Sequence, residues 1–170
     1  MDTRPDYRKV FTDSLEGIEE LSELKAFATG SPLPCWGAIY GRFQEVKLSV
    51  DTARKLVERW LSCRECGRFL VLMLHQRRQD EAIVRLFADH FEHLPDYVQA
   101  YLVSLPEGRA VLSDSGVTLP PYFAELFSDE GRARRERRTV EARIAKLLRF
   151  EWAPAEEAME HEPEEMEVQT

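Results

Sequence analysis

The sequence predicts a mainly α-helical fold, a compact domain of about five to seven helices with at most one small β-hairpin. Apolar residues recur at intervals of three and four along several segments, as in a helix that buries one face. Side chains suited to helix N-caps precede several of these segments. The chain has 170 residues, of which 44% are hydrophobic and 32% charged, which is typical of a globular domain. We expect one domain over residues 1–152 and a disordered acidic tail over residues 153–170.

The first third of the chain contains one clear helix. Residues 1–12 are polar and predict an irregular lead-in, and Asp13 is a candidate N-cap for a helix that ends by Gly30. Residues 35–43 are apolar but interrupted by two glycines, which indicates either a short helix or a packed loop. A core helix is predicted over residues 51–61 by a broad apolar stripe. This stripe consists of Ala53, Leu56, Val57, Trp60 and Leu61.

The centre of the chain holds its longest apolar run, residues 69–74. Periodicity alone leaves this run open as a buried strand or a buried helix. The polar residues that follow predict a turn, and Asp80 is a good N-cap for a helix over residues 81–93. That helix would carry His90 and His93 three residues apart, as neighbours on its surface.

The last third predicts two short elements, a small hairpin and one long helix. Asp96 can cap a helix over residues 97–105, and residues 122–127 fit one or two helical turns. Residues 110–119 fit either a small hairpin or a loop, preceded by a turn. The long basic helix should begin after Ser128 or Asp129 and end near position 150.

A Cys-x-x-Cys pair followed by glycine, Cys63 and Cys66, has the form of a zinc knuckle. With His90 and His93 it resembles, in outline, a zinc finger with two cysteine and two histidine ligands. The spacing between the pairs is longer than in the common finger. This set of four is the first candidate metal site.

A second candidate set replaces the two distal histidines. It consists of Cys35, Cys63, Cys66 and His75, which would give zinc three thiolates and one imidazole. Two other interpretations of the cysteine pair stay open. Both cysteines can be ordinary buried core residues, or they can form a redox-active pair.

The charge is unevenly distributed along the chain, whose net charge is −8. Residues 130–150 hold eight Arg or Lys against three Glu, whereas residues 151–170 hold eight Glu and neither Arg nor Lys. A basic helix therefore runs into an acidic tail, which we expect to fold back on the arginines at low salt. The candidate contact residues for nucleic acid or a partner are Arg132, Arg134, Arg135, Arg137 and Arg138.

No Gly-rich phosphate loop or serine or zinc hydrolase motif is present in the sequence. We therefore expect a non-enzymatic interaction protein, an adaptor or regulator of another protein, with zinc as its only cofactor if it has one. A nucleic-acid-binding accessory factor is the alternative. The separation of Arg85 and His90 resembles that in some helical ribonucleases, which makes a metal-independent ribonuclease a third interpretation.

Composition also gives expectations about the compartment. Three cysteines and a charged N-terminus without an apolar core predict an intracellular protein, cytoplasmic or nuclear. Because the sequence lacks an apolar stretch of about eighteen residues, we expect no membrane partner.

Overall fold

The computed structural model describes residues 6–30 and 36–149. These residues form ten α-helices and three short 3-10 helices, without a strand among them, and this confirms the predicted mainly α-helical class. The helices outnumber the predicted five to seven because several segments assigned to loops are helical. The acidic tail and Cys35 lie outside the described residues, so the expectations about them stay predictions.

The described residues separate into two compact units. The first comprises residues 6–47 and 145–149, and the second comprises residues 48–144. The single domain expected over residues 1–152 stays a prediction.

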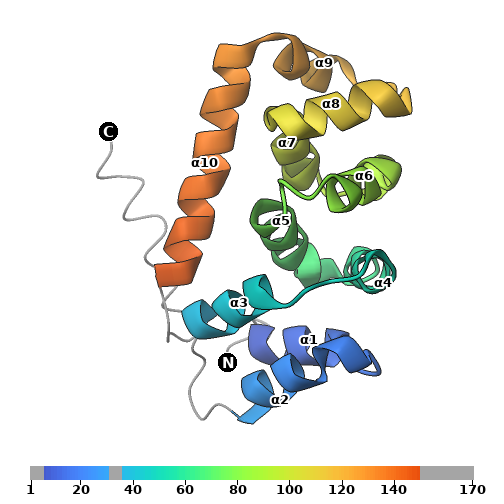
Figure 1. Ribbon diagram of the computed structural model, residues 1–170. Helices are drawn as coiled ribbons and strands as arrows, with labels where there is room; N and C mark the ends of the chain where they lie inside the picture. The colour runs from blue at the N-terminus through green and yellow to red at the C-terminus, as the bar shows by residue number, and fades with distance from the viewer. Residues whose placement is uncertain (1–5, 31–35, 150–170) are drawn as a thin grey trace. The chain divides into compact units, whose positions relative to one another are not determined.

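The first unit contains three helices (blue to cyan in Figure 1). They are α1 (Tyr7–Ser14), α2 (Ser22–Gly30) and α3 (Trp36–Glu45), with the 3-10 turn η1 (Glu19–Leu21) before α2. Phe11 of α1 is fully buried and meets the rings of Tyr40 and Phe43 of α3 edge-on, with centroids 6.1 and 6.0 Å apart. These aromatic contacts join α1 to α3.

The N-cap predicted at Asp13 is wrong. Asp6 caps α1 instead, and its carboxylate accepts a hydrogen bond from the Lys9 backbone N–H at 3.2 Å. The polar segment expected to be irregular is therefore helical from Tyr7, because it supplies both a cap and the buried Phe11. Asp13 instead forms an exposed ion pair with Lys9.

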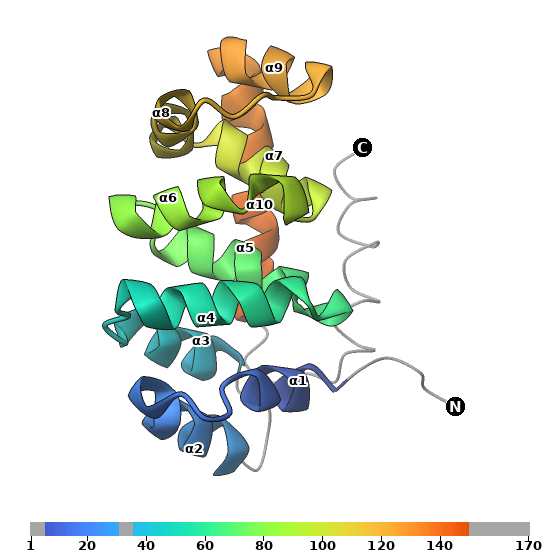
Figure 2. The same cartoon turned by 90° about the vertical axis from the view of Figure 1, so that its right-hand side faces the viewer.

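The second unit contains the other seven helices, which follow one another in Figure 2. They are α4 (Val50–Leu61), α5 (Gly67–Gln76), α6 (Glu81–Asp89), α7 (Asp96–Ser104), α8 (Pro106–Ser115), α9 (Pro121–Ser128) and α10 (Glu130–Arg149). The 3-10 turn η2 (Arg64–Cys66) precedes α5, and the 3-10 turn η3 (Phe91–His93) follows α6. Helix α10 begins in the second unit, and its residues 145–149 belong to the first unit.

Helices α4 and α5 form the part of the core nearest the cysteines. The predicted apolar stripe of α4 is confirmed at four positions, because Ala53, Leu56, Val57 and Trp60 are at most 1% exposed. The apolar run over residues 69–74 is helical and lies in α5, where it is buried on every side. Trp60 contacts Phe69 with ring centroids 5.7 Å apart, which packs α4 against α5.

The predicted cap of α6 is confirmed, but its predicted length is wrong. The Asp80 carboxylate accepts from the Ala82 N–H at 3.1 Å. The helix then ends at Asp89, and His93 belongs to the separate turn η3. His90 closes the helix, and its Nδ1 lies 2.9 Å from the carbonyl oxygen of Leu86.

The hairpin interpretation of residues 110–119 is wrong. Most of this segment belongs to α8, which starts with Pro106 in its first turn and buries Val111 and Leu112. Proline suits the first turn of a helix because backbone N–H groups there have no partner within the helix, so proline loses no hydrogen bond by lacking one. Gly116 ends the helix with a φ of 67°, a left-handed conformation that glycine adopts without a steric cost.

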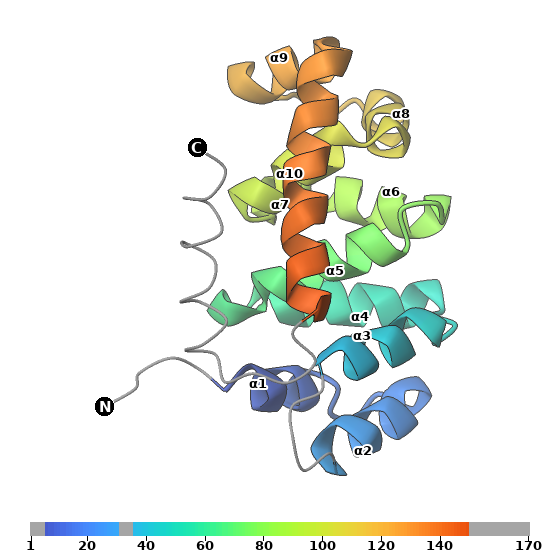
Figure 3. The same cartoon turned by 90° about the vertical axis from the view of Figure 1, so that its left-hand side faces the viewer.

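Helix α10 matches its prediction and runs alongside α5 and α7 (Figures 1 and 3). The carboxylate of Asp129 accepts from the Arg132 N–H at 3.1 Å, which confirms one of the two predicted caps. Ala133, Val140 and Ile144 face the interior. None of the described helices is both long and apolar enough to cross a membrane.

Candidate functional site

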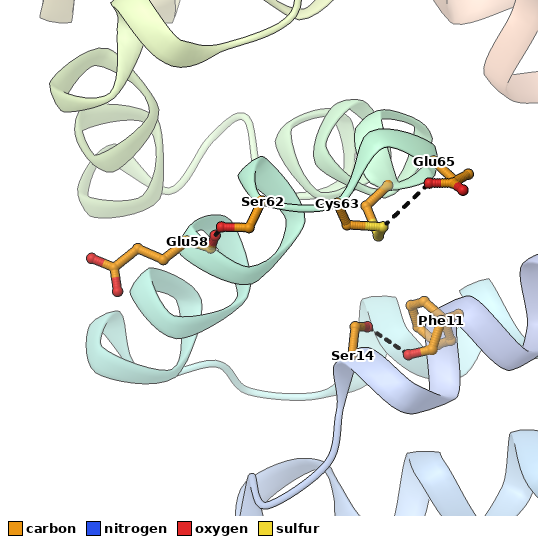
Figure 4. The surroundings of a disulfide bond; sticks show 7 residues. Phe11, Ser14, Glu58, Ser62, Cys63 and Glu65 are labelled. Carbon is orange, nitrogen blue, oxygen red and sulfur yellow. Dashed lines mark hydrogen bonds between the residues drawn. A yellow bond between two sulfur atoms is a disulfide. The ribbon is translucent and has the colours of Figure 1, made fainter.

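The two cysteines of the Cys-x-x-Cys motif are joined by a disulfide in the turn between α4 and α5 (Figure 4). Cys63 lies before η2 and is partly exposed, whereas Cys66 lies at the end of η2 and is only 1% exposed. The Oε2 atom of Glu65 lies 4.0 Å from the Sγ atom of Cys63. The pair therefore presents one accessible sulfur and one buried sulfur.

Gly67, which begins α5 directly after the disulfide, is closely approached by the side chain of Tyr97. A Cβ atom at this position would lie 1.8 Å from the hydroxyl oxygen of Tyr97 and 3.6 Å from a ring carbon of Pro95. A larger residue at this position would therefore require the exposed Tyr97 side chain to move. The glycine that suggested a zinc knuckle thus serves packing between helices.

Among the described residues, the structure brings together the two cysteines that the predicted metal sets share, but not the histidines. Within the described residues, no group of three or more His, Cys, Asp or Glu side chains lies close enough to hold a metal ion. The first set is divided because His90 bonds to its own helix and His93 is exposed in η3. Zinc takes cysteine as thiolate, whereas here the two sulfurs are bonded to each other.

The second metal set stays a prediction. Cys35 lies outside the described residues, and His75 bonds elsewhere. The Nδ1 atom of His75 lies 2.9 Å from the hydroxyl oxygen of Tyr101 in α7, and this hydroxyl lies 3.2 Å from Oε2 of Glu141 in α10. The three side chains link α5, α7 and α10 through a polar chain at the centre of the second unit.

Hydrogen-bond accounting sets the direction of this chain. An ionised Glu141 only accepts, so the single hydroxyl proton of Tyr101 is donated to it. The Nδ1 atom of His75, 2.9 Å from the Tyr101 oxygen, also lies 3.5 Å from Nη1 of Arg78, which donates to the carbonyl oxygen of His75 at 2.7 Å. Burial lowers the pKa of His75 below its usual value, with a further contribution from the positive charge of Arg78, while Glu141 opposes both. Burial also raises the pKa of Tyr101, which is fully enclosed.

Two arginines hold the C-terminal end of α7. Arg137 of α10 donates to the carbonyl oxygen of Ser104 at 3.0 Å, and Arg109 of α8 donates to the same oxygen at 3.1 Å. Arg109 also donates to the carbonyl oxygen of Val103 and pairs with Glu130. The last carbonyls of a helix lack partners within it and favour positive charge, so these arginines stabilise the end of α7.

The five arginines predicted to contact a partner therefore separate into two groups. Arg137 is bonded to α7, and Arg132 pairs with Glu125 at 2.9 Å and lies over the ring of Tyr122 in α9. Arg134, Arg135 and Arg138 are exposed, and their side chains form no hydrogen bond or ion pair with another described residue. These three residues are called the arginine face below.

The third interpretation, a ribonuclease, finds no shared site for its two residues. Arg85 pairs with Asp114 of α8 at 3.7 Å, whereas His90 bonds to the backbone of its own helix. In the first unit, an open groove of about 390 Å³ is lined by both apolar and polar residues, and two of them, Lys25 and Glu16, form an ion pair at 2.9 Å.

No protein-family model, curated protein or solved structure matches the chain. The residues of the polar chain were missed in the sequence, except for His75, which was assigned to a metal site. Tyr101 and Glu141 are 40 positions apart, and only the packing of α10 on α7 brings them together. The one signal for this contact in the sequence was Glu141 itself, an acidic residue that follows the buried Val140 in a basic helix.

Proposed function

We propose that this protein is an interaction protein whose arginine face binds an acidic segment of another protein. The observation that carries the proposal is the division of the arginines of α10. Arg132 and Arg137 have partners inside the unit, whereas Arg134, Arg135 and Arg138 are exposed and unpaired among the described residues. The first pair is explained by the fold, and the other three are not.

The arginine face carries a local electrostatic cost that a ligand would relieve. Arg134 and Arg138 are four residues apart, and Arg135 and Arg138 are three apart, so their charges are neighbours on one helix face. Like charges at these spacings destabilise a helix by about 0.2–0.5 kcal/mol per pair. A row of carboxylates would remove this repulsion and accept paired hydrogen bonds from the guanidinium groups.

Two features favour an acidic protein segment over a nucleic acid. The described part of α10 contains no aromatic residue on which a base could stack. The chain as a whole carries a net charge of −8, which repels an extended polyanion that reaches beyond three arginines. A short acidic segment avoids both disadvantages, and the nucleic-acid alternative becomes an outcome of the test.

The proposal is tested with a short fluorescent Glu-rich peptide and a single-stranded RNA of equal charge, at low salt. The variant Arg134→Gln, Arg135→Gln, Arg138→Gln should bind the peptide at least about tenfold more weakly than the natural chain. The control is Arg54→Gln, Lys55→Gln, Arg59→Gln on α4, which changes the charge equally on another exposed face. We expect the control variant to bind the peptide like the natural chain.

The alternatives give different results. An equal loss in both variants would show attraction to total charge alone, against the proposal. Tighter binding of the RNA, lost only in the arginine-face variant, would replace it with the nucleic-acid interpretation. Deletion of residues 153–170 should strengthen peptide binding if the acidic tail competes for the same arginines.

A further inference from the structure

We propose that Cys63 and Cys66 form a thiol–disulfide exchange site, whose substrate is a dithiol on a protein or a small molecule. The proposal rests on the sulfur pair and its surroundings in the second unit. It is independent of the arginine face, so the failure of either proposal leaves the other standing.

The different exposure of the two sulfurs gives the pair a direction. Exchange proceeds when a thiolate attacks one sulfur of a disulfide and the other sulfur leaves. Cys63 is partly exposed, whereas Cys66 is 1% exposed, so an incoming thiolate can reach only the first. Cys63 is therefore the attacked sulfur and Cys66 the leaving sulfur.

The pair lies where a helix favours the negative charge that exchange creates. Helical residues run without a break from the start of η2 to the end of α5, with Cys63 directly before η2 and Cys66 directly before α5. The unpaired N–H groups at the start of a helix carry partial positive charge. Cys66 occupies the N-cap position of α5, where a released thiolate is favoured by this partial charge and disfavoured by burial.

The turn is flanked by packing contacts in addition to the disulfide. Trp60 and Phe69 pack on either side of it, and Tyr97 lies against Gly67. The Cα atoms of the two cysteines are 5.3 Å apart. This separation lies within the range that a disulfide spans, so a reduced pair that keeps it can be oxidised again.

The reaction transfers two electrons from the substrate to the pair. One substrate thiolate forms a bond to Sγ of Cys63, the Cys63–Cys66 bond breaks, and its electron pair passes to Cys66, which then takes a proton from water. The second substrate thiolate attacks the substrate sulfur of this mixed disulfide and releases Cys63 as a thiolate, which is protonated in turn. The products are a substrate disulfide and a reduced cysteine pair. The two substrate thiols lose one proton each, and Cys63 and Cys66 gain one each.

Glu65 should slow the first step. Its carboxylate oxygen lies 4.0 Å from Sγ of Cys63, so an approaching thiolate meets a negative charge. The Glu58 carboxylate points away from the sulfurs, as Figure 4 shows. Glu58→Gln is therefore a control for Glu65→Gln, with the same change in charge at a place that the thiolate does not approach.

The first experiment measures which sulfur reacts. Full-length chains carry Cys35→Ser together with either Cys66→Ser or Cys63→Ser, and are treated with glutathione disulfide while folded. The chain that keeps Cys63 should form the mixed disulfide at least about tenfold faster than the chain that keeps Cys66. In denaturant the two rates should become similar. Equal rates in the folded protein would overturn the proposal.

Two further measurements keep the test decisive. If circular dichroism shows that Cys66→Ser is unfolded, Cys66→Ala, which suits the buried position, takes its place. In the oxidised Cys35→Ser chain, Glu65→Gln should speed reduction by dithiothreitol about two- to threefold, and Glu58→Gln should not. An unchanged rate with Glu65→Gln would overturn the assignment of Cys63 as the attacked sulfur.

Discussion

The two faces of α10 use the same residue type for different purposes. On the inner face, Arg137 is bonded to the end of α7, beside the buried Ala133 and Val140. On the outer face, Arg134 and Arg138 are exposed and unpaired among the described residues. Adjacent positions of one helix are about 100° apart, so a single step along the chain moves an arginine from a structural to an exposed role.

This difference shows that the arginine run cannot be treated as one charged surface. An arginine near the core is tolerated where a carbonyl or a carboxylate accepts its protons. An exposed arginine contributes little to stability, and its charge remains accessible to a partner. Changes on the inner face should therefore alter folding, and changes on the outer face should alter binding alone.

The largest effect is expected where a charge enters the inner face. Val140→Asp should lower the free energy of unfolding by about 3 kcal/mol or more, because a carboxylate replaces a side chain that is only 9% exposed. The neighbouring Thr139→Asp, on the exposed face, should change it by less than about 0.5 kcal/mol. Urea denaturation measures both, and similar losses would show that the two faces do not differ.

The polar chain should give the next largest effect. Tyr101→Phe keeps the buried ring but removes the hydroxyl that joins His75 to Glu141. We expect a loss of about 2 kcal/mol, because both partly buried groups lose their partner. The matched control in urea denaturation is Tyr122→Phe. Tyr122 is exposed, and its hydroxyl forms only a long hydrogen bond, 3.5 Å, to Glu136. A stability for Tyr101→Phe equal to that of the control would contradict the role of the chain.

A smaller effect separates two adjacent arginines. Arg137→Met keeps the aliphatic stem but removes the donor to Ser104, which should cost about 1 kcal/mol. Arg138→Met should leave stability within about 0.5 kcal/mol of the natural chain, or raise it slightly by removing like-charge repulsion. Thermal unfolding of the two variants is the measurement, and the reverse order of stability would refute the assignment of Arg137 to the inner face.

The smallest effect is a dependence of stability on pH. Because the pKa of His75 is lowered in the folded protein, the unfolded chain binds a proton first as the pH falls below about 6.5. The contribution of His75 is complete above that pH and is lost as the pH falls toward the folded-state pKa. His75→Gln should therefore lose less stability than the natural chain between about pH 7 and pH 5.

The control for the pH experiment is His93→Gln, since His93 is exposed. Chemical denaturation at several pH values should give this variant the same pH dependence as the natural chain. If His75→Gln also kept the natural dependence, then the polar chain would contain no group that titrates in this range.

Elements with a complete local signal were predictable from the sequence. Helix α4 has both an apolar stripe and a capping residue within a few positions, and α10 has a cap at Asp129. Elements whose boundaries depend on packing were not predictable from the sequence. The segment around Val111 is compatible with a strand as well as a helix, and it is helical because α8 packs against α6 and α7.

The candidate sites divide in the same way. The sequence places the two cysteines within reach of each other, because residues three apart in a turn are always close. It cannot show which sulfur is exposed, since that depends on the packing of α4 and α5 around the turn. The two metal sets stay predictions, and in the structure His90 and His75 have partners on their own helix and on α7, respectively.

The sequence by itself determined the helical class, the positions of the caps at Asp80 and Asp129, and the charge of α10, because each depends on residues within a turn or two. Only the tertiary structure decided which arginines are exposed and that His75 meets Tyr101 and Glu141. The physical reason is distance along the chain: these contacts exist only where helices far apart in sequence pack together, and packing selects one face of each helix.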